Sequence, residues 1–201
     1  MIKLNNLSIY YGDNQVLSNI NATFESGKHY LIQGKSGLGK TSLLNAILGL
    51  IKYEGTIEKD YSKVSMVFQE DRLLEHSNVY TNLKFVQPST YSNNEYEHKL
   101  DEILKQLDLY DNKYSPIRFL SGGMKRRVSI ARALLYEGDV LLADEPLKGL
   151  DSALQQKTLA LMNQIFLNKT ILLVSHHDLE ESNYIKCVLQ NDLLVCIESI
   201  K

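Results

Sequence analysis

The residues with the clearest chemical potential lie at 34–41, where the sequence reads GKSGLGKT. Gly34, Gly39, Lys40 and Thr41 fit the pattern G-x-x-x-x-G-K-[ST], in which backbone N–H groups ring the phosphates of a nucleotide. The lysine neutralises phosphate charge and the hydroxyl ligates Mg²⁺. An apolar run precedes this motif and another follows it, so we expect the strand, glycine loop and helix that the motif requires.

A second candidate group is the pair Asp144 and Glu145, which directly follows the apolar run at 140–143. Ligands of open α/β sheets sit at the carboxyl ends of the strands. We expect Asp144 to hold Mg²⁺ and Glu145 to act as a base or to orient water near the γ-phosphate. Buried carboxylates are costly unless cations meet them, and Lys40 and Mg²⁺ would supply that charge.

Two polar residues follow further apolar runs: Gln69 comes after 64–68, and His176 comes after 170–174. Both are expected at the same edge of the sheet. The alternative for Gln69 is a loop amide, and the alternative for His176 with His177 is an exposed pair or a metal site. Because neighbouring residues on a strand point to opposite faces, that pair is a poor chelate, and we interpret His176 as a γ-phosphate contact.

The stretch FLSGGMKRRVSIARALL at 119–135 places Ser121 and two glycines before an apolar segment that carries basic residues. This layout is typical of a helix start that binds phosphate. The basic run at 125–127 is interpreted as a solvated or interface face of that helix, in preference to a nucleic-acid patch.

The remaining pattern alternates strand-like and helical segments. Runs at 3–11 and 16–24 predict an antiparallel edge, and 29–33, 55–58 and 64–68 predict further strands. Apolar spacing predicts helices at 42–50, 94–107, 122–136, 152–166 and 178–184, with strands at 139–144 and 170–175 and a hairpin across 191–192. This alternation predicts an α/β fold with a mainly parallel sheet covered by helices.

Composition narrows the class of protein. With 201 residues, 44% hydrophobic and 23% charged, the chain is expected to form one compact unit. A net charge of −2 argues against a nucleic-acid binder, which would show a basic balance. The apolar runs are too short to cross a bilayer, and the N-terminal stretch is too polar for a signal peptide. The two cysteines, Cys187 and Cys196, are predicted to be buried reduced thiols on adjacent strands.

Taken together, these residues resemble an ATP-binding cassette, the ATPase subunit of ABC transporters, over nearly the whole chain. The resemblance implies a P-loop NTPase fold of the ABC ATPase type with an antiparallel β edge. It implies a single domain over 1–201, with a helical signature subdomain at about 72–136 inserted in the nucleotide-binding core. Tyr11 matches the aromatic residue that stacks on adenine, with Tyr10 as the alternative, and LSGGM at 120–124 matches the signature.

The resemblance also implies a role for each site residue and the cofactors ATP and Mg²⁺. The implied catalytic residues are Lys40, Gln69, Glu145 and His176. The implied nucleotide-binding residues are Tyr11, Gly34, Lys35, Ser36, Gly37, Leu38, Gly39, Lys40, Thr41, Ser42, Ser121, Gly122, Gly123 and Asp151. The implied Mg²⁺ ligands are Thr41, Gln69 and Asp144.

In this family two cassettes pair head to tail, with each signature facing the ATP that the other cassette holds. The resemblance therefore implies a second cassette, in a homodimer or with a close paralogue. It also implies integral membrane subunits, a possible extracytoplasmic solute-binding protein, no nucleic acid, and a peripheral place on the cytoplasmic face of the cell membrane. Leu73, Leu74 and Val79 are candidates for a groove that receives a membrane subunit, with core packing as the alternative.

The stretches VFQEDRLL and LSGGMKRRVSIARAL look most like ATPases of the nitrate, sulfonate and taurine import group. Departures from that group are Ser77-Asn78, Lys148-Gly149 and a short segment between Gly49 and Val64. Import is favoured, and the alternatives are an exporter ATPase, a non-transport ABC regulator of a membrane complex and, less favoured, a P-loop small-molecule kinase. No substrate is inferred, because selectivity belongs to the membrane and binding subunits.

Overall fold

The computed structural model describes residues 1–176, 179, 183–190 and 193–197. The chain divides into two compact units. The first unit comprises Met1–Val64, Asp139–Glu145 and Asn168–Lys201, and the second comprises Ser65–Gly138 and Pro146–Leu167. Each unit is described by itself below. No helix in the described part of the chain is both long enough and apolar enough to span a membrane.

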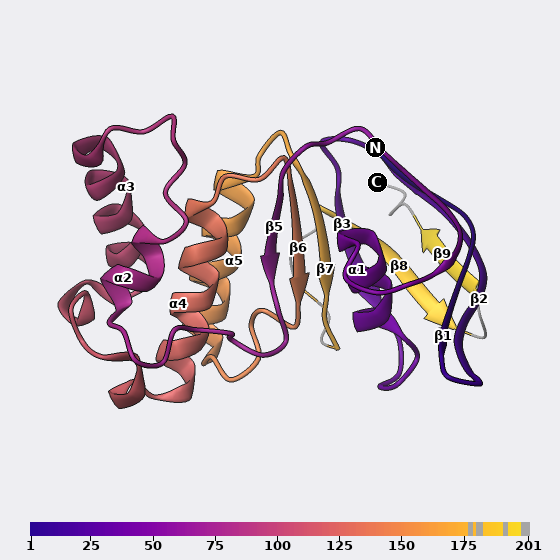
Figure 1. The fold of residues 1–201 in the computed structure, drawn as a ribbon, viewed down its shortest axis with the longest axis horizontal. Coiled ribbons are helices and arrows are strands. Elements are labelled where there is room, and N and C mark those ends of the chain that lie inside the picture. The colour runs from indigo at the N-terminus through magenta and orange to yellow at the C-terminus, as the bar shows by residue number, and fades with distance from the viewer. Residues whose placement is uncertain (177–178, 180–182, 191–192, 198–201) are drawn as a thin grey trace. The chain divides into compact units, whose positions relative to one another are not determined.

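The first unit contains an antiparallel sheet in the order β2-β1-β4 (Figure 1). Its strands are β1 (Ile2–Tyr11), β2 (Asn14–Phe24) and β4 (Glu54–Lys59). Bulges interrupt the register between β1 and β2, and the inward side chains of β1 are fully buried apolar residues. This sheet contains the antiparallel edge that the runs at 3–11 and 16–24 predict.

The first unit also contains a mainly parallel sheet, in the order β6-β7-β3-β8-β9. Its strands are β3 (His29–Gln33), β6 (Val140–Asp144), β7 (Thr170–Val174), β8 (Tyr184–Gln190) and β9 (Leu193–Ile197). Only β8 and β9 pair antiparallel among these strands. Every residue of β6 and β7 is buried, as expected for central parallel strands, which read as continuous apolar runs.

The prediction of reduced, buried thiols is wrong. The sulfurs of Cys187 and Cys196 form a disulfide, and only Cys187 is buried. The prediction that the two residues lie on adjacent strands is confirmed, since Cys187 pairs directly with Cys196 across β8 and β9. Directly opposite residues project from the same face of a sheet, so the strand register brings the two sulfurs together.

The second unit is mostly helical, and the chain enters it within β5 (Val64–Val67). Its helices are α2 (Val79–Lys84), α3 (Asn93–Gln106), α4 (Gly122–Leu135) and α5 (Ser152–Ile165), with 3₁₀ turns at Tyr110–Asn112 and Ile117–Phe119. Helix α4 packs against α2 and α3 (Figure 1). Ser92 and Glu95 form a capping box at the start of α3, which buries the apolar stripe that the sequence predicts.

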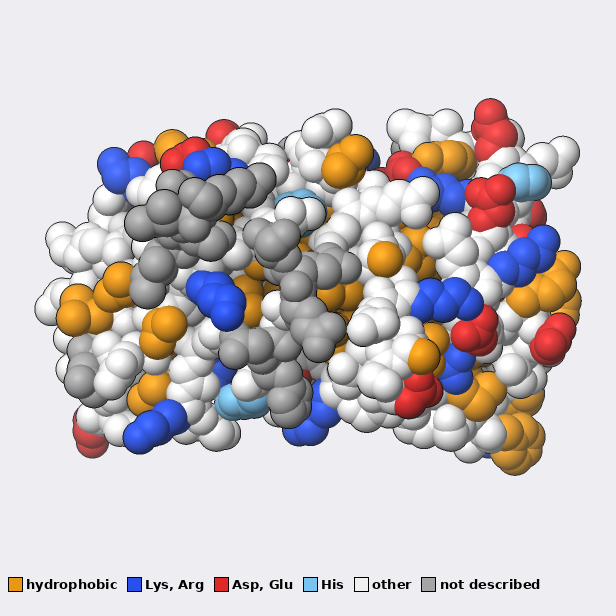
Figure 2. Space-filling view, turned by 180° about the vertical axis from the view of Figure 1, so that it is seen from behind, with side chains coloured by type: hydrophobic (Ala, Val, Ile, Leu, Met, Phe, Trp, Pro, Cys, Tyr) orange, Lys and Arg blue, Asp and Glu red, His pale blue; other side chains and the backbone are white. Residues whose placement is uncertain are grey.

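Most predicted elements are confirmed to within about two residues, the usual uncertainty of an element boundary. The sequence did not define α2 or the two 3₁₀ turns, which are too short to show a clear period. The predicted helix at 178–184 and the turn at 191–192 fall largely outside the described residues. On the face shown in Figure 2, basic and acidic side chains are interspersed over the described part of the second unit.

Candidate nucleotide site

The loop between β3 and α1 (Lys40–Leu48) contains glycines at positions where a side chain would clash with neighbouring strands. A Cβ atom on Gly34 would lie 2.6 Å from the carbonyl oxygen of Leu189, and one on Gly39 would lie 2.8 Å from Cγ1 of Val16. Gly39 also has φ of 89°, in the left-handed region. The glycines therefore let the loop lie close against β2 and β8 while its amides stay available at the start of α1.

Lys40 lies folded into this loop. Its side-chain nitrogen donates to the carbonyl oxygens of Gly34 and Lys35, both at 2.8 Å, and the residue is only 6% exposed. Burial lowers the pKa of Lys40 below its ordinary value, and the charges of Glu145 and Asp144 partly counteract that effect. A cation is thus placed where phosphates would otherwise meet two carboxylates.

Thr41 and Asp144 form a direct contact between α1 and the end of β6. The Thr41 hydroxyl donates to Oδ2 of Asp144 at 2.6 Å, although the residues are 103 positions apart in the sequence. Asp144 is 2% exposed. Hydroxyl and carboxylate oxygens are the donor set that Mg²⁺ takes from a protein when phosphates and water complete its shell, so the pair fits this ion.

Glu145 and His176 also meet in the first unit. Nε2 of His176 lies 2.7 Å from Oε1 of Glu145. The register of β6 and β7 pairs Asp144 with Val174, which brings the residues after both strands to one edge. Glu145 has φ of 48°, and its amide donates to the Val174 carbonyl at 2.9 Å. A non-glycine residue in the left-handed region is uncommon and marks a position that its surroundings hold firmly.

The two tyrosines considered for adenine stacking differ in their partners. The Tyr11 hydroxyl lies 3.2 Å from Oγ of Ser42 in α1, whereas the Tyr10 hydroxyl accepts from the amide of Gln15. Tyr11 is 51% exposed, so much of its ring is open to a ligand. The contact with Ser42 ties Tyr11, and not Tyr10, to the phosphate loop.

The signature residues belong to the second unit, at the start of α4. Ser121 is the N-cap, and its hydroxyl accepts from the amide of Met124 at 3.2 Å. A Cβ atom on Gly122 would meet nothing within 4 Å, whereas one on Gly123 would lie 3.4 Å from the carbonyl oxygen of Gly149. The start of this 14-residue helix therefore lies open at the surface, where its positive end is available to an anion.

Gln69 and Asp151 also lie in the second unit. Gln69 is exposed and follows β5. Asp151 caps α5, where its carboxylate accepts from the amide of Leu154 at 2.9 Å. The structure therefore gives Asp151 a local structural role besides the nucleotide contact that the resemblance implies.

The interpretation of the basic run as a solvated or interface face is wrong for Arg126. Its side chain is buried, at 5% exposure, and it donates to backbone carbonyls inside the second unit. The sequence held a signal for this placement, because Arg126 shares the helix spacing of Ile130 and Ala133, which are also buried. Lys125 does reach the surface, where it pairs with Glu75.

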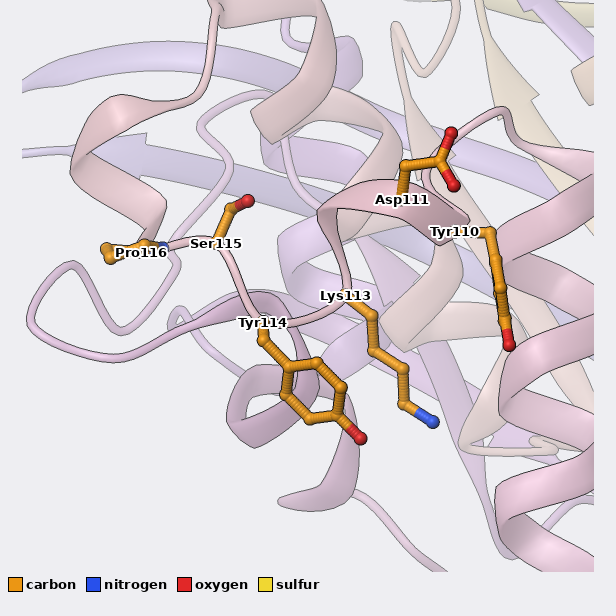
Figure 3. A pocket seen from close by; sticks show the side chains of 6 residues that line it. All are labelled: Tyr110, Asp111, Lys113, Tyr114, Ser115 and Pro116. Atoms are coloured by element: carbon orange, nitrogen blue, oxygen red, sulfur yellow. The ribbon is translucent and has the colours of Figure 1, made fainter.

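Two of the residues of the second unit that are proposed to line a groove for a membrane subunit, Leu74 and Val79, differ in burial. Val79 is fully buried, so core packing applies to it, whereas Leu74 is 44% exposed. A cavity of about 430 Å³ lies elsewhere in the unit, lined by Tyr110, Asp111, Lys113, Tyr114, Ser115 and Pro116. In Figure 3 Tyr110, Lys113 and Tyr114 extend to one side of this segment and Asp111 to the other.

The ammonium group at this cavity is already held by the protein. Burial alone would lower the pKa of Lys113, but hydrogen bonds to Asp101 and Glu97 outweigh it and raise the pKa above its ordinary value. The network ties α3 to the segment after it, and we assign no ligand to this cavity.

Comparison with known proteins gives one consistent family. The family model described as ABC transporter matches residues 17–148. The chain is 36% identical over 195 residues to the methionine import ATP-binding protein MetN of Clostridioides difficile (strain 630), covering 88% of this chain and 61% of that protein. It is 32% identical over 193 residues to the spermidine/putrescine import ATP-binding protein PotA of Thermotoga maritima, covering 89% and 52%. The chain thus spans a little over half the length of these curated relatives.

Solved structures agree with the fold. The dimeric structure of MJ0796, described as a bacterial ABC transporter cassette, has a TM-score of 0.85 at 29% identity, with 96% of each chain covered. A dimeric post-hydrolysis state of the same ATP-binding cassette, bound to ADP and Pi, has a TM-score of 0.84 at 27% identity, again covering 96% of each chain. The predicted fold class is confirmed.

Proposed function

Because the chain belongs to the family of ABC transporter ATPases, whose members hydrolyse ATP, we propose that it powers solute transport as one of two paired cassettes. The observation that carries this proposal is the contact between Glu145 and His176 beside the buried Lys40. The three side chains supply a base, a residue that orients it and a cation for the phosphates, all within the first unit.

The proposed reaction is an attack of water on the γ-phosphorus of ATP, which breaks the bond from this phosphorus to the β–γ bridging oxygen, so that ADP leaves and inorganic phosphate forms. Glu145 accepts the proton of the attacking water. His176 holds the Glu145 carboxylate through Nε2 before ATP binds, and it contacts the γ-phosphate once ATP is bound. Lys40 and the loop amides stabilise the charge that develops on the phosphate oxygens. Mg²⁺, held by Thr41 and Asp144 with Gln69 as the further proposed ligand, would neutralise phosphate charge when bound.

The signature completes the site of a second cassette in this proposal. Ser121, Gly122 and Gly123 lie at an exposed helix start, which favours an anion brought by another molecule. Support comes from the dimeric state of MJ0796, which shares the fold. We further propose that Asp151 lies near the nucleotide in the pair, and that the partner is a second copy of this chain or a close paralogue.

The two units are proposed to act as one ABC domain, with the second unit in the place of the helical subdomain. The pair would work at the cytoplasmic face of the membrane against integral membrane subunits. Import is favoured because both curated relatives are named as import ATP-binding proteins, one for methionine and one for spermidine and putrescine. An extracytoplasmic solute-binding protein fits the import reading. The likeness to the nitrate, sulfonate and taurine group stays a prediction.

The decisive variant is Glu145→Gln, which keeps the side-chain shape and removes the base. We expect kcat to fall about 100- to 1,000-fold while ATP still binds. The ATP-bound dimer should then accumulate, as measured by light scattering after size exclusion with saturating ATP and Mg²⁺. The matched control is Glu102→Gln, which removes an exposed glutamate of α3 and should leave both readouts unchanged. A Glu145→Gln protein that stays monomeric and turns over ATP at the full rate would sink the proposal.

A further inference from the structure

The segment at 68–72, here called the glutamine loop because it contains Gln69, is held by two arginines of α4. Nη1 of Arg126 donates to the carbonyl oxygen of Phe68 at 2.5 Å and to Oδ1 of Asp71 at 3.2 Å. Arg132 donates to the carbonyl oxygens of Asp71 and Arg72 at 3.0 and 2.7 Å. Hydrogen bonds from a charged donor are about twice as strong as neutral ones, so the loop is firmly attached to α4.

The backbone of the loop shows the effect of this attachment. Arg72 has φ of 47°, in the left-handed region, and its guanidinium lies 3.8 Å from the ring centre of Phe68. A non-glycine residue keeps such a conformation only where the surrounding contacts determine it. The contacts from Arg132 and the stacking on Phe68 are of that kind, so the loop has one defined shape within the second unit.

Arg126 reaches a second segment as well. Its Nε donates to the carbonyl oxygen of Pro146 at 3.0 Å, and Pro146 is the residue that follows Glu145 in the chain. The chain passes between the two units at 64/65 and again at 145/146. Arg126 therefore contacts the segments that follow both of these passages, and it does so from the helix that Ser121 caps.

We propose that Arg126 is a positioning residue for ATP hydrolysis. It ties the glutamine loop to the signature helix and to the segment after Glu145, and in this way it holds Gln69 in place. The planar guanidinium makes this possible because it carries several donors in a fixed fork, which lysine and glutamine lack. The inference rests on the proposed function, since it requires Gln69 to act at ATP.

The neighbouring Arg127 provides a matched control. It donates to the carbonyl oxygens of Leu107 and Asp108 at 2.8 and 3.1 Å and to that of Gly123 at 3.3 Å. Both arginines thus come from α4 and bind backbone carbonyls of the second unit. These three acceptors of Arg127 lie outside the glutamine loop and do not include Pro146.

The experiment measures ATP hydrolysis by Arg126→Met, by Gln69→Ala and by the double variant that carries both changes. Arg127→Met is the control. For Arg126→Met we expect kcat to fall about 10- to 100-fold, the cost of a small misplacement at a reacting centre. The KM for ATP should stay within about twofold. The phosphate loop, which lies in the first unit and is unchanged in this variant, binds the ATP phosphates equally well in the ground state and in the transition state. In the Gln69→Ala background, Arg126→Met should cause no further fall, because Arg126 acts through Gln69.

Hydrogen exchange of the free protein supplies a readout that does not depend on turnover. Amides of residues 68–72 should exchange faster in Arg126→Met and at the original rate in Arg127→Met. Asp71→Asn is a milder variant of the same interaction. It removes the charge that Arg126 pairs with and keeps the hydrogen bonds from Arg126 to the carbonyl oxygens of Phe68 and Pro146. If Arg126→Met does not fold, Asp71→Asn must lower kcat about threefold at constant KM, again without further loss in the Gln69→Ala background.

The outcomes separate this inference from the proposed function. Losses that multiply in the double variant would show that Arg126 does not act through Gln69. An equal loss of kcat in Arg127→Met would show that the loss is not specific to the glutamine loop. Either result would overturn the inference. If Gln69→Ala has no effect on kcat, the inference also fails. The proposed function stands or falls separately, with the dimer and turnover of Glu145→Gln.

Discussion

The two units treat their nucleotide-site residues in opposite ways. In the first unit Lys40 and Asp144 are buried, and the polar side chains are already paired: Lys40 with the loop carbonyls, Thr41 with Asp144, and His176 with Glu145. In the second unit Ser121 and Asp151 are exposed, and their side-chain oxygens accept hydrogen bonds from backbone amides at the starts of α4 and α5. Gly122 has no neighbour within 4 Å of a Cβ position.

This difference indicates that the two units contribute different functions to the nucleotide site. A set of polar and charged side chains that is already paired before any ligand arrives suits the chemistry of phosphate transfer. An exposed helix start contributes only backbone donors and the positive end of a helix, which suits an anion brought by another molecule. Changes in the first unit should therefore affect chemistry most, and changes in the second should act through association, the position of the glutamine loop and local stability.

The largest effect is expected for Lys40→Met. Removal of the buried cation should lower kcat by about 100- to 1,000-fold and weaken ATP binding, because the phosphate charge then faces Asp144 and Glu145 without a counter-charge. Steady-state kinetics and calorimetric titration with ATP measure both effects. Lys59→Met is the control, since Lys59 also donates to a backbone carbonyl, that of Ile47, but outside the phosphate loop. Equal losses in the two variants would show that the effect is not specific to the phosphate loop.

An intermediate effect is expected for Gly122→Asp. The new side chain has space, and a carboxylate at a helix start is favourable, so the midpoint of thermal unfolding should not fall. Hydrolysis should nevertheless drop about 10- to 100-fold, because the charge repels an approaching phosphate. Calorimetry and turnover are compared with those of Gly122→Ala, which adds no charge. Full turnover in Gly122→Asp would show that this helix start does not face a phosphate.

The smallest effect is expected for Asp151→Ala. Loss of the cap should cost about 1 kcal/mol in the free energy of unfolding. Ser92→Ala removes the cap of α3 and should cost a similar amount by the same denaturant titration. Turnover distinguishes the two variants: only Asp151→Ala should lower kcat, by about threefold, if Asp151 also serves the nucleotide. Unchanged kcat in both variants would leave Asp151 as a cap alone.

Individual residues show which features of the structure could be predicted from the sequence and which could not. The spacing of Gly34, Gly39 and Lys40 predicted a phosphate loop between a strand and a helix, and the structure has that order. Arg126 was assigned to a solvated face because charge suggests exposure, although its helix spacing matches buried positions. The disulfide was missed because the two cysteines were predicted to be reduced, although their place on adjacent strands was predicted correctly.

The sequence alone determined most of the elements and the phosphate motif, because apolar periodicity and glycine spacing are local properties of the chain. Only the tertiary structure decided that Thr41 meets Asp144, that His176 meets Glu145, and that Arg126 joins the glutamine loop to Pro146. Each of these contacts joins segments far apart in the sequence. They depend on strand order, register and helix packing, which no local pattern specifies.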